Sequence, residues 1–301
     1  METRQLSLRA TRDRQANKAA YLFLLPVLIL LVVYVFYPII DTFRLSGYQW
    51  NGISADKKSI GFSNWFFLLK DKHFWAAFKN NIIVMIFSIV IQIPLGTALA
   101  TFIEFSGKKS TIFKVVWFIP MLMSSVAIGF LFSYVLSSNG GVISTISNFF
   151  GGKNIDLLGN PQTVLYTIIG IIAWRFTPFY MVYTMAAYSG IPEEVYEASL
   201  IDGANRSQYF WKIALPLLKP ALYTGAIMSM VGSLKYFDLV FVMTGGGPGT
   251  ASELMATYMY RESFKTFNMG YGSTVAAGMF ILISLIAIIT FKLLQKNQET
   301  N

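Results

Sequence analysis

The sequence predicts an all-α, polytopic membrane protein with six transmembrane helices. Of its 301 residues, 54% are hydrophobic and only 13% are charged, about half the charged share of a typical soluble domain. Residues 19–40, 80–103 and 115–152 contain no charged side chain at all. Each of these runs exceeds the ~20 apolar residues that a helix needs to cross a bilayer.

The first expected span covers residues 20–42. Its apolar run is longer than the roughly 7–15 residues of a signal-peptide core, so we expect a retained helix. A polar, mobile cytoplasmic segment at 1–18 precedes it, and residues 19–301 form one transmembrane domain. The remaining spans are expected at 80–103, 113–136, 163–188, 217–240 and 272–292.

An even number of spans places both termini on the same side of the membrane. The segment before the first span is rich in arginine and lysine, which favours a cytoplasmic location for both termini. The loop 189–216 then also lies inside, and the loops 43–79 and 244–270 lie outside. Basic residues in 43–79 oppose this topology, but the N-terminal cluster and the 189–216 loop outweigh them. The net charge of +9 therefore reflects topology, and no nucleic-acid partner is expected.

The loop 189–216 carries six charges between two spans. Such a segment cannot lie in hydrocarbon and must lie at a membrane face. Pro192 suits the first turn of a helix, and Glu193 and Glu194 suit its positive N-terminal end. Ala198 and Ser199 are small, which allows another protein to approach that surface closely.

A turn and a second helix are expected directly afterwards. Gly203 stands where a helix end often needs a left-handed residue. Asn205 and Gln208 have the spacing of a capping box that opens the next helix. Pro216 is expected to interrupt the entry to the fifth span. The loop therefore reads as a charged helix–turn–helix, although an ordinary amphipathic interfacial loop is the alternative.

This loop resembles the coupling loop of permease subunits in ATP-binding-cassette (ABC) importers. The pattern of that family reads Glu-Ala-Ala, three residues, Gly, nine residues, Ile-x-Leu-Pro. The matching positions, with Asp202 beside the glycine, are Glu197, Ala198, Ser199, Gly203, Ile213, Leu215 and Pro216. Only Ser199 departs from the pattern.

The resemblance implies the type I importer (MetI-like) fold, with a core of the second to sixth helices and a first helix that wraps around a neighbour. It also implies four partners: a second homologous permease, two copies of a cytoplasmic ATPase and an extracytoplasmic solute-binding protein. The coupling residues would then seat in a cleft of the ATPase.

The outer loops resemble those of maltose-type carbohydrate permeases. The similarity lies in Thr244–Thr250, in Gly270–Ser273 and in Ile60–Trp65. It implies inward passage of a sugar or oligosaccharide by alternating access, across the plasma (inner) membrane of a prokaryote. A peptide, a polyamine or an anion is the alternative solute within the same architecture.

Two groups of residues are candidates for a substrate path. Charges within spans often mark function, and Arg175 in the fourth span shares a helical face with three apolar residues. The fifth span carries a small and polar stripe at helical spacing. Packing and internal pairing are the alternative roles. The candidates are Ile172, Arg175, Phe176, Phe179, Ser229, Gly232, Ser233 and Tyr236.

No catalytic residues are expected in this chain. The Gly107–Lys109 stretch and the glycine-rich turn at 245–249 both lack the pattern of a phosphate-binding loop. ATP and Mg²⁺ are therefore expected on the partner ATPase. There is no cysteine, and a single histidine, His73, lacks metal co-ligands. A stand-alone secondary transporter would need coupling charges and repeated halves, and a membrane enzyme would need a nucleophile–base cluster.

Overall fold

The computed structural model describes residues 21, 23–106, 111–152 and 154–299. The expected mobile segment 1–18 and the Gly107–Lys109 stretch lie outside these residues. In chain order, the elements are η1 (Val32–Phe36), α2 (Tyr37–Leu45), β1 (Tyr48–Gln49), β2 (Lys58–Ser59), α3 (Ser63–Lys70), α4 (Lys72–Ser106), α5 (Thr111–Leu122), α6 (Ser125–Val135), α7 (Val142–Phe149), α8 (Val164–Tyr188), α9 (Glu193–Ile201), α10 (Arg206–Tyr209), η3 (Phe210–Ala214), α11 (Leu215–Ser233), α12 (Asp238–Met243), α13 (Met255–Tyr260), η4 (Arg261–Lys265) and α14 (Met269–Glu299).

The all-α membrane fold expected from the sequence is confirmed. Among the described residues, five helices are long and apolar enough to cross a membrane, and a bent pair makes a sixth if it is counted as one span. The five helices are Phe23–Leu45, Lys72–Ser106, Val164–Tyr188, Arg206–Ser233 and Met269–Lys292. β1 and β2 form a short antiparallel hairpin in which Tyr48 pairs with Ser59.

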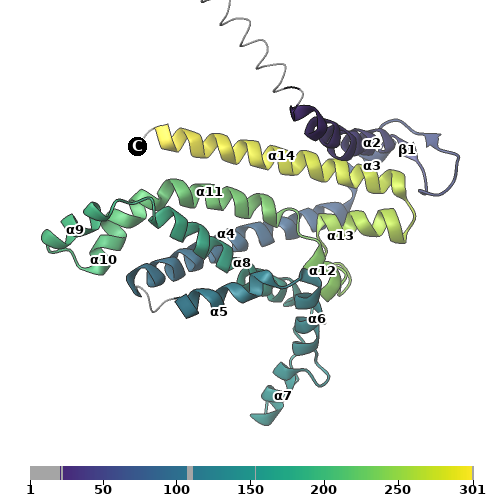
Figure 1. Ribbon diagram of the computed structural model, residues 1–301. Helices are drawn as coiled ribbons and strands as arrows, with labels where there is room; N and C mark the ends of the chain where they lie inside the picture. Colours follow the sequence, from purple (N-terminus) through teal and green to yellow (C-terminus); the bar gives the residue numbers. More distant parts are fainter. Residues whose placement is uncertain (1–20, 22, 107–110, 153, 300–301) are drawn as a thin grey trace, which may run out of the picture.

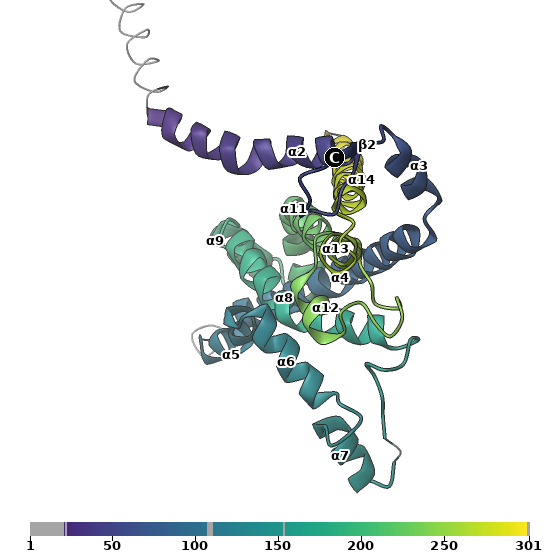
Figure 2. The same cartoon turned by 90° about the vertical axis from the view of Figure 1, so that its right-hand side faces the viewer.

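The first helix stands apart from the rest of the bundle (Figure 2). None of its most apolar window is buried, and it packs on the described chain through its last turns against α14. There the rings of Phe43 and Phe280 meet edge to face at 6.0 Å, and Thr274 Oγ1 donates to the Ser46 carbonyl. An apolar helix with so little cover must find lipid or another protein along its length.

The core of the bundle is built on the close packing of α4 against α8. Gly96 makes this approach possible, because a Cβ there would stand 2.7 Å from Tyr180 Cβ and 2.9 Å from the Met181 nitrogen. Small residues at helix crossings allow such contact in membranes, where dispersion and packing replace the hydrophobic effect. Val84 and Ile168 are fully buried in the cluster that results.

The third expected span, 113–136, is not one straight helix. It consists of α5 and α6, which meet at an angle of 94°. Ser124 begins the second piece as an N-cap, and its hydroxyl accepts the Val126 N–H at 3.3 Å. Gly129 on α6 then lets Val242 of α12 approach, since a Cβ at the glycine would lie 2.7 Å from a Val242 methyl carbon.

The fifth expected span, 217–240, is also interrupted. α11 ends at Ser233, and residues 234–237 break the helix before α12 begins at Asp238. The side chains of Lys235 and Tyr236 therefore belong to a turn and not to the helical face that the sequence spacing suggested. The turn is placed beside α8, against which both α11 and α12 pack.

The segments expected outside the membrane lie together at one end of the bundle. There Asp71 is 8% exposed, and it accepts hydrogen bonds from the Tyr258 and Tyr271 hydroxyls and, at 2.9 Å, from the His73 N–H. Burial by itself raises the pKa of Asp71, but these hydrogen bonds outweigh it and hold the pKa below its usual value. The carboxylate thus ties the start of α4 to α13 and α14.

Candidate functional site

The loop 189–216 folds as the helix–turn–helix that its sequence predicts. α9 and α10 lie at the end of the bundle where α14 finishes, opposite α13 and the β1–β2 hairpin (Figure 1). Gly203 has φ +77°, which confirms the expected left-handed residue. Ala204 N–H donates to Ser199 O at 2.9 Å and Gly203 N–H to Leu200 O at 3.0 Å, a pattern that closes the end of α9.

The capping box is confirmed as well. The side chain of Asn205 accepts the Gln208 N–H, and the side chain of Gln208 accepts the Asn205 N–H, both at 2.9 Å. Two of the free donors at the start of α10 are satisfied in this way. The turn between α9 and α10 is therefore closed by hydrogen bonds among its own residues.

The predicted coupling residues divide into two groups by exposure. Glu197, Ala198 and Asp202 are exposed. Ser199 is only 3% exposed and donates to Tyr196 O at 2.6 Å, so the expectation that it lies on the approachable surface is wrong. Its small side chain instead lies on the buried face of α9, where a larger residue would push the helix outward.

Pro216 does not interrupt the entry to the fifth span, as its sequence position suggested. The helix is continuous from Arg206 to Ser233. The π-helical turn η3 accommodates the proline, and in it the Leu215 N–H donates to Phe210 O. Because this bond reaches back five residues, the missing N–H of Pro216 does not break the helix. Pro216 is exposed, whereas Ile213 and Leu215 are half-buried.

Arg175 is held by the break between α5 and α6. One of its terminal nitrogens, Nη1, donates to Ser125 Oγ, and the other, Nη2, donates to Met123 O at 3.2 Å. Its guanidinium also lies 5.0 Å from the centroid of the Phe176 ring. The Nε atom is buried and has no partner among the described residues. Arg175 thus stabilises the bend and still has a free donor.

The polar stripe of α11 turns inward. Ser229 and Ser233 are 2% and 0% exposed. Ser229 Oγ donates to Gln92 Oε1 of α4 at 3.2 Å, and Ser233 Oγ donates to Ser229 O at 2.6 Å. Gln92 is fully buried, and its Nε2 has no partner among the described residues. The sequence analysis missed Gln92, although a long polar side chain within the uncharged run 80–103 is a usable signal.

A small cavity of about 120 Å³ brings Tyr236 of the second candidate group to three residues of the first. Ile172, Arg175 and Phe176 line it from α8, and Tyr236 lines it from the turn after α11. The Phe176 and Tyr236 rings lie 5.5 Å apart. The sequence analysis did not assign the other lining residues to the path: Ser125, Lys235, Phe237, Asp238 and Leu239.

Four of the predicted path residues do not line this cavity: Phe179, Ser229, Gly232 and Ser233. The Phe179 ring stacks on Tyr183 at 6.4 Å along α8, and Gly232 is exposed with open space around its Cα. The cavity nevertheless joins residues from α6, α8 and the α11–α12 turn, which is where moving helices would change its size. Its role as a substrate path stays a prediction.

Apolar spans around a polar buried cluster, together with a charged surface helix pair, define a polytopic membrane transport component. The chain belongs to the family of binding-protein-dependent transport system inner membrane components, whose model matches residues 92–299.

Relatives and a solved structure resemble the chain over most of its length. The osmoprotective compounds uptake permease protein GgtC of Synechocystis sp. is 31% identical over 89% of this chain and 95% of its own length. The trehalose/maltose transport system permease protein MalF of Thermococcus litoralis is 28% identical over 91% of this chain and 93% of its own length. A chain from the crystal structure of a bacterial ABC transporter involved in alginate import has a TM-score of 0.82 at 22% identity, over 96% of this chain and 99% of that chain. At this identity, the likeness supports the fold.

Proposed function

We propose that this chain is the transmembrane subunit of an ATP-driven, binding-protein-dependent importer that moves a sugar or oligosaccharide into a prokaryotic cell. The observation that carries the proposal is the α9–α10 pair, an exposed and self-capped helix–turn–helix joined directly to a membrane helix. Glu197 and Ala198 lie on its free surface, and the turn at Gly203 fixes the angle between its two helices. The family assignment supports the same role.

In this proposal, the termini and the loop 189–216 face the cytoplasm, and Asp71 and its two tyrosine partners face outward. A second homologous permease completes the translocation path, and the exposed first helix packs against it. Two copies of an ATPase hold ATP and Mg²⁺ and dock on the α9–α10 pair of each permease. An extracytoplasmic solute-binding protein delivers the solute to the outer face.

The continuous helix gives the proposed coupling a physical route. The segment Arg206–Ser233 spans 28 residues, or about 42 Å at 1.5 Å per residue. One end begins at the Asn205 cap, and the other ends beside the cavity that Arg175 and Tyr236 line. Closure of the ATPase dimer on α9 and α10 would tilt this helix and change the cavity. Nucleotide and loaded binding protein drive transport only if each prefers one of the two states.

The sugar assignment rests on the outer-loop resemblance and on relatives such as MalF. GgtC, named for osmoprotective compounds, favours a second candidate function, which is import of a non-sugar solute by the same architecture. Mass spectrometry of the ligand that co-purifies with the co-encoded binding protein separates these two candidates.

Transport by the reconstituted complex tests the proposal. Proteoliposomes that contain both permeases and the ATPase, with ATP inside and loaded binding protein outside, should accumulate labelled sugar. Omission of ATP, of the ATPase or of the binding protein should abolish uptake. Accumulation by this chain alone, or accumulation driven by a proton gradient without ATP, would identify a secondary transporter instead.

A further inference from the structure

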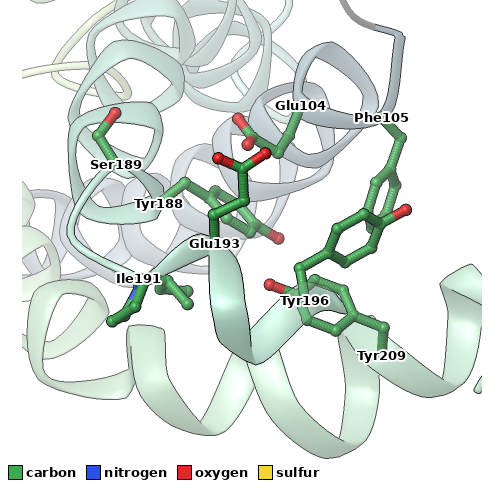
Figure 3. A pocket seen from close by; sticks show the side chains of 9 residues that line it. Glu104, Phe105, Tyr188, Ser189, Ile191, Glu193, Tyr196 and Tyr209 are labelled. Atoms are coloured by element: carbon green, nitrogen blue, oxygen red, sulfur yellow. The ribbon is translucent and has the colours of Figure 1, made fainter. Parts of the chain in front are cut away.

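A pocket of about 460 Å³ lies between α9–α10 and the ends of α4 and α8. Figure 3 shows Glu104, from α4, and Glu193, from the first turn of α9, extending into the same space. Four aromatic side chains complete most of the wall: Phe105, Tyr188, Tyr196 and Tyr209. This pocket lies at the opposite end of α11 from the Arg175 cavity.

The described lining of the pocket is acidic. It contains Glu104 and Glu193 and no lysine or arginine, and neither glutamate forms an ion pair within the part of the chain that the structure describes. Arg206 lies beside the wall, with its guanidinium carbon 5.7 Å from the Phe105 ring centroid. Two carboxylates beside aromatic faces form an environment that attracts a cation.

Tyr209 offers the pocket a hydrogen-bonding group besides the two carboxylates. Its side chain is buried, with 5% of the residue exposed, and its ring packs on Tyr196 at 4.9 Å and on Phe105 at 6.2 Å. Its hydroxyl points into the pocket (Figure 3) and has no hydrogen-bond partner among the described residues, whereas the Tyr188 hydroxyl is bonded to Thr101 Oγ1 at 2.8 Å. Because this oxygen is open to the pocket and not bonded within the described chain, it can accept a hydrogen bond from an incoming N–H donor.

The wall chemistry favours an organic cation over a metal ion. Ca²⁺ requires six to eight oxygen ligands, and Mg²⁺ requires an octahedron of them. No group of three or more His, Cys, Asp or Glu side chains that could hold a metal ion exists among the described residues. A guanidinium group, in contrast, can donate to two carboxylates and a hydroxyl while it stacks on aromatic rings.

We propose that this pocket receives an arginine side chain of the cytoplasmic ATPase, next to the α9 docking surface. The proposal rests on the proposed function, because it requires the ATPase to cover this face. Glu193 begins α9, and Ala198 lies five residues further on, about 7.5 Å along the helix axis. An ATPase seated on Ala198 therefore also reaches the mouth of the pocket. The arginine is a second attachment point that holds the start of α9 while the Glu197–Ala198 surface seats in the ATPase.

The affinity of the ATPase for the permease pair in lipid nanodiscs tests this assignment. The informative variants are Glu104→Gln with Glu193→Gln, which keep the side-chain shape and remove both charges, and Tyr209→Phe, which removes only the hydroxyl. Glu194→Gln is the matched control, because Glu194 also lies in the first turn of α9 but does not line the pocket.

We expect the double glutamine variant to bind the ATPase at least tenfold more weakly and with a smaller dependence on salt concentration. Tyr209→Phe should bind about threefold more weakly, and Glu194→Gln should bind within twofold of the unaltered chain. A double variant within twofold of the unaltered chain, or an equal loss in Glu194→Gln, would overturn the pocket assignment.

A free cation is the competing occupant. If 1 mM spermidine or arginine raises the thermal midpoint of the isolated subunit, and the double glutamine variant loses that shift, the ATPase assignment is overturned. The proposed function fails separately, since it requires the unaltered permease pair to bind the ATPase in the first place.

Discussion

Replacement of Gly203 by valine tests the coupling turn with little interference from other effects. Gly203 has φ +77°, and a Cβ added there would meet nothing within 4 Å. The whole cost is therefore backbone strain, about 1–2 kcal/mol for an L-residue in the left-handed region. That cost is small beside the ~5–15 kcal/mol that stabilises a typical folded domain, so we expect normal insertion and assembly.

The strain is instead relieved locally, at the two hydrogen bonds that close α9. These run from the Gly203 N–H to Leu200 O and from the Ala204 N–H to Ser199 O. If they lengthen, the angle between α9 and α10 changes, and the ATPase no longer moves the helix that begins at Arg206. We expect Gly203→Val to lose most sugar uptake and the stimulation of ATP hydrolysis by loaded binding protein.

Two control variants separate strain from size. Gly203→Asn should retain most uptake, because asparagine adopts the left-handed region more readily than other side chains do. Gly170→Val should also retain uptake, because Gly170 on α8 is exposed, has open space around its Cα and has no left-handed φ. Uptake and ATPase stimulation in proteoliposomes measure all three variants. Full activity of Gly203→Val would refute the coupling role of this turn.

Three further predictions concern the predicted substrate path, the hydrogen bonds of Asp71 and the topology. Ser233→Leu and Tyr236→Leu should each lower uptake at least fivefold with normal assembly, because Tyr236 lines the cavity and Ser233 belongs to the buried polar stripe of α11; unchanged uptake in both would assign these residues to packing. Asp71→Asn should lower the stability of the subunit by about 1.5–3 kcal/mol near pH 7, because the ionised carboxylate accepts two tyrosine hydroxyls. Since the folded-state pKa of Asp71 lies below its unfolded value, the stabilisation is fully present above the unfolded value and is lost as the pH falls through the folded one. The difference in thermal midpoint between the two proteins should therefore hold from pH 8 to 5 and shrink below pH 4, and a constant difference down to pH 3 would contradict this. A cysteine at Ser207, the sole cysteine of the chain, should react with an impermeant maleimide only in opened cells, and labelling from outside intact cells would reverse the proposed topology.

Local chemistry made the α9–α10 pair predictable from the sequence. The left-handed turn needs only Gly203, and the cap of α10 needs only Asn205 and Gln208, so residues within six positions of each other determine the geometry. The apolar runs likewise predict helices, because the backbone must satisfy its own hydrogen bonds in lipid. These parts of the fold depend on near neighbours in the chain.

The breaks depend on residues that are far apart, and the sequence does not reveal them. The bend between α5 and α6 is held by Arg175, about fifty positions further along the chain. The end of α11 at Ser233 is followed by a turn that packs on α8, so Tyr236 leaves the helical face that its spacing predicted. Pro216 is the opposite case. The sequence predicted a break there, but the π-helical turn η3 keeps the helix continuous.

The orientation of a small helix around its own axis is a further feature that spacing alone leaves open. Ala198 and Ser199 are both small, and the sequence placed both on the docking surface. The bundle buries Ser199 and exposes Ala198, because the contacts of α9 with Tyr209 and the helix ends decide which face turns inward. The docking surface therefore includes Ala198 but not Ser199, although the sequence motif contains both.

Site-specific cross-linking at Ala198 tests most directly whether the α9 surface is where the ATPase docks. A benzophenone maleimide attached to Ala198→Cys, the sole cysteine of the chain, should cross-link to the ATPase in the assembled transporter, and ATP binding should change the yield. The same probe on Ile40→Cys, an exposed position in the first helix, should not reach the ATPase. Equal cross-linking from both positions, or none from Ala198→Cys in a complex that hydrolyses ATP, would contradict the proposed docking surface.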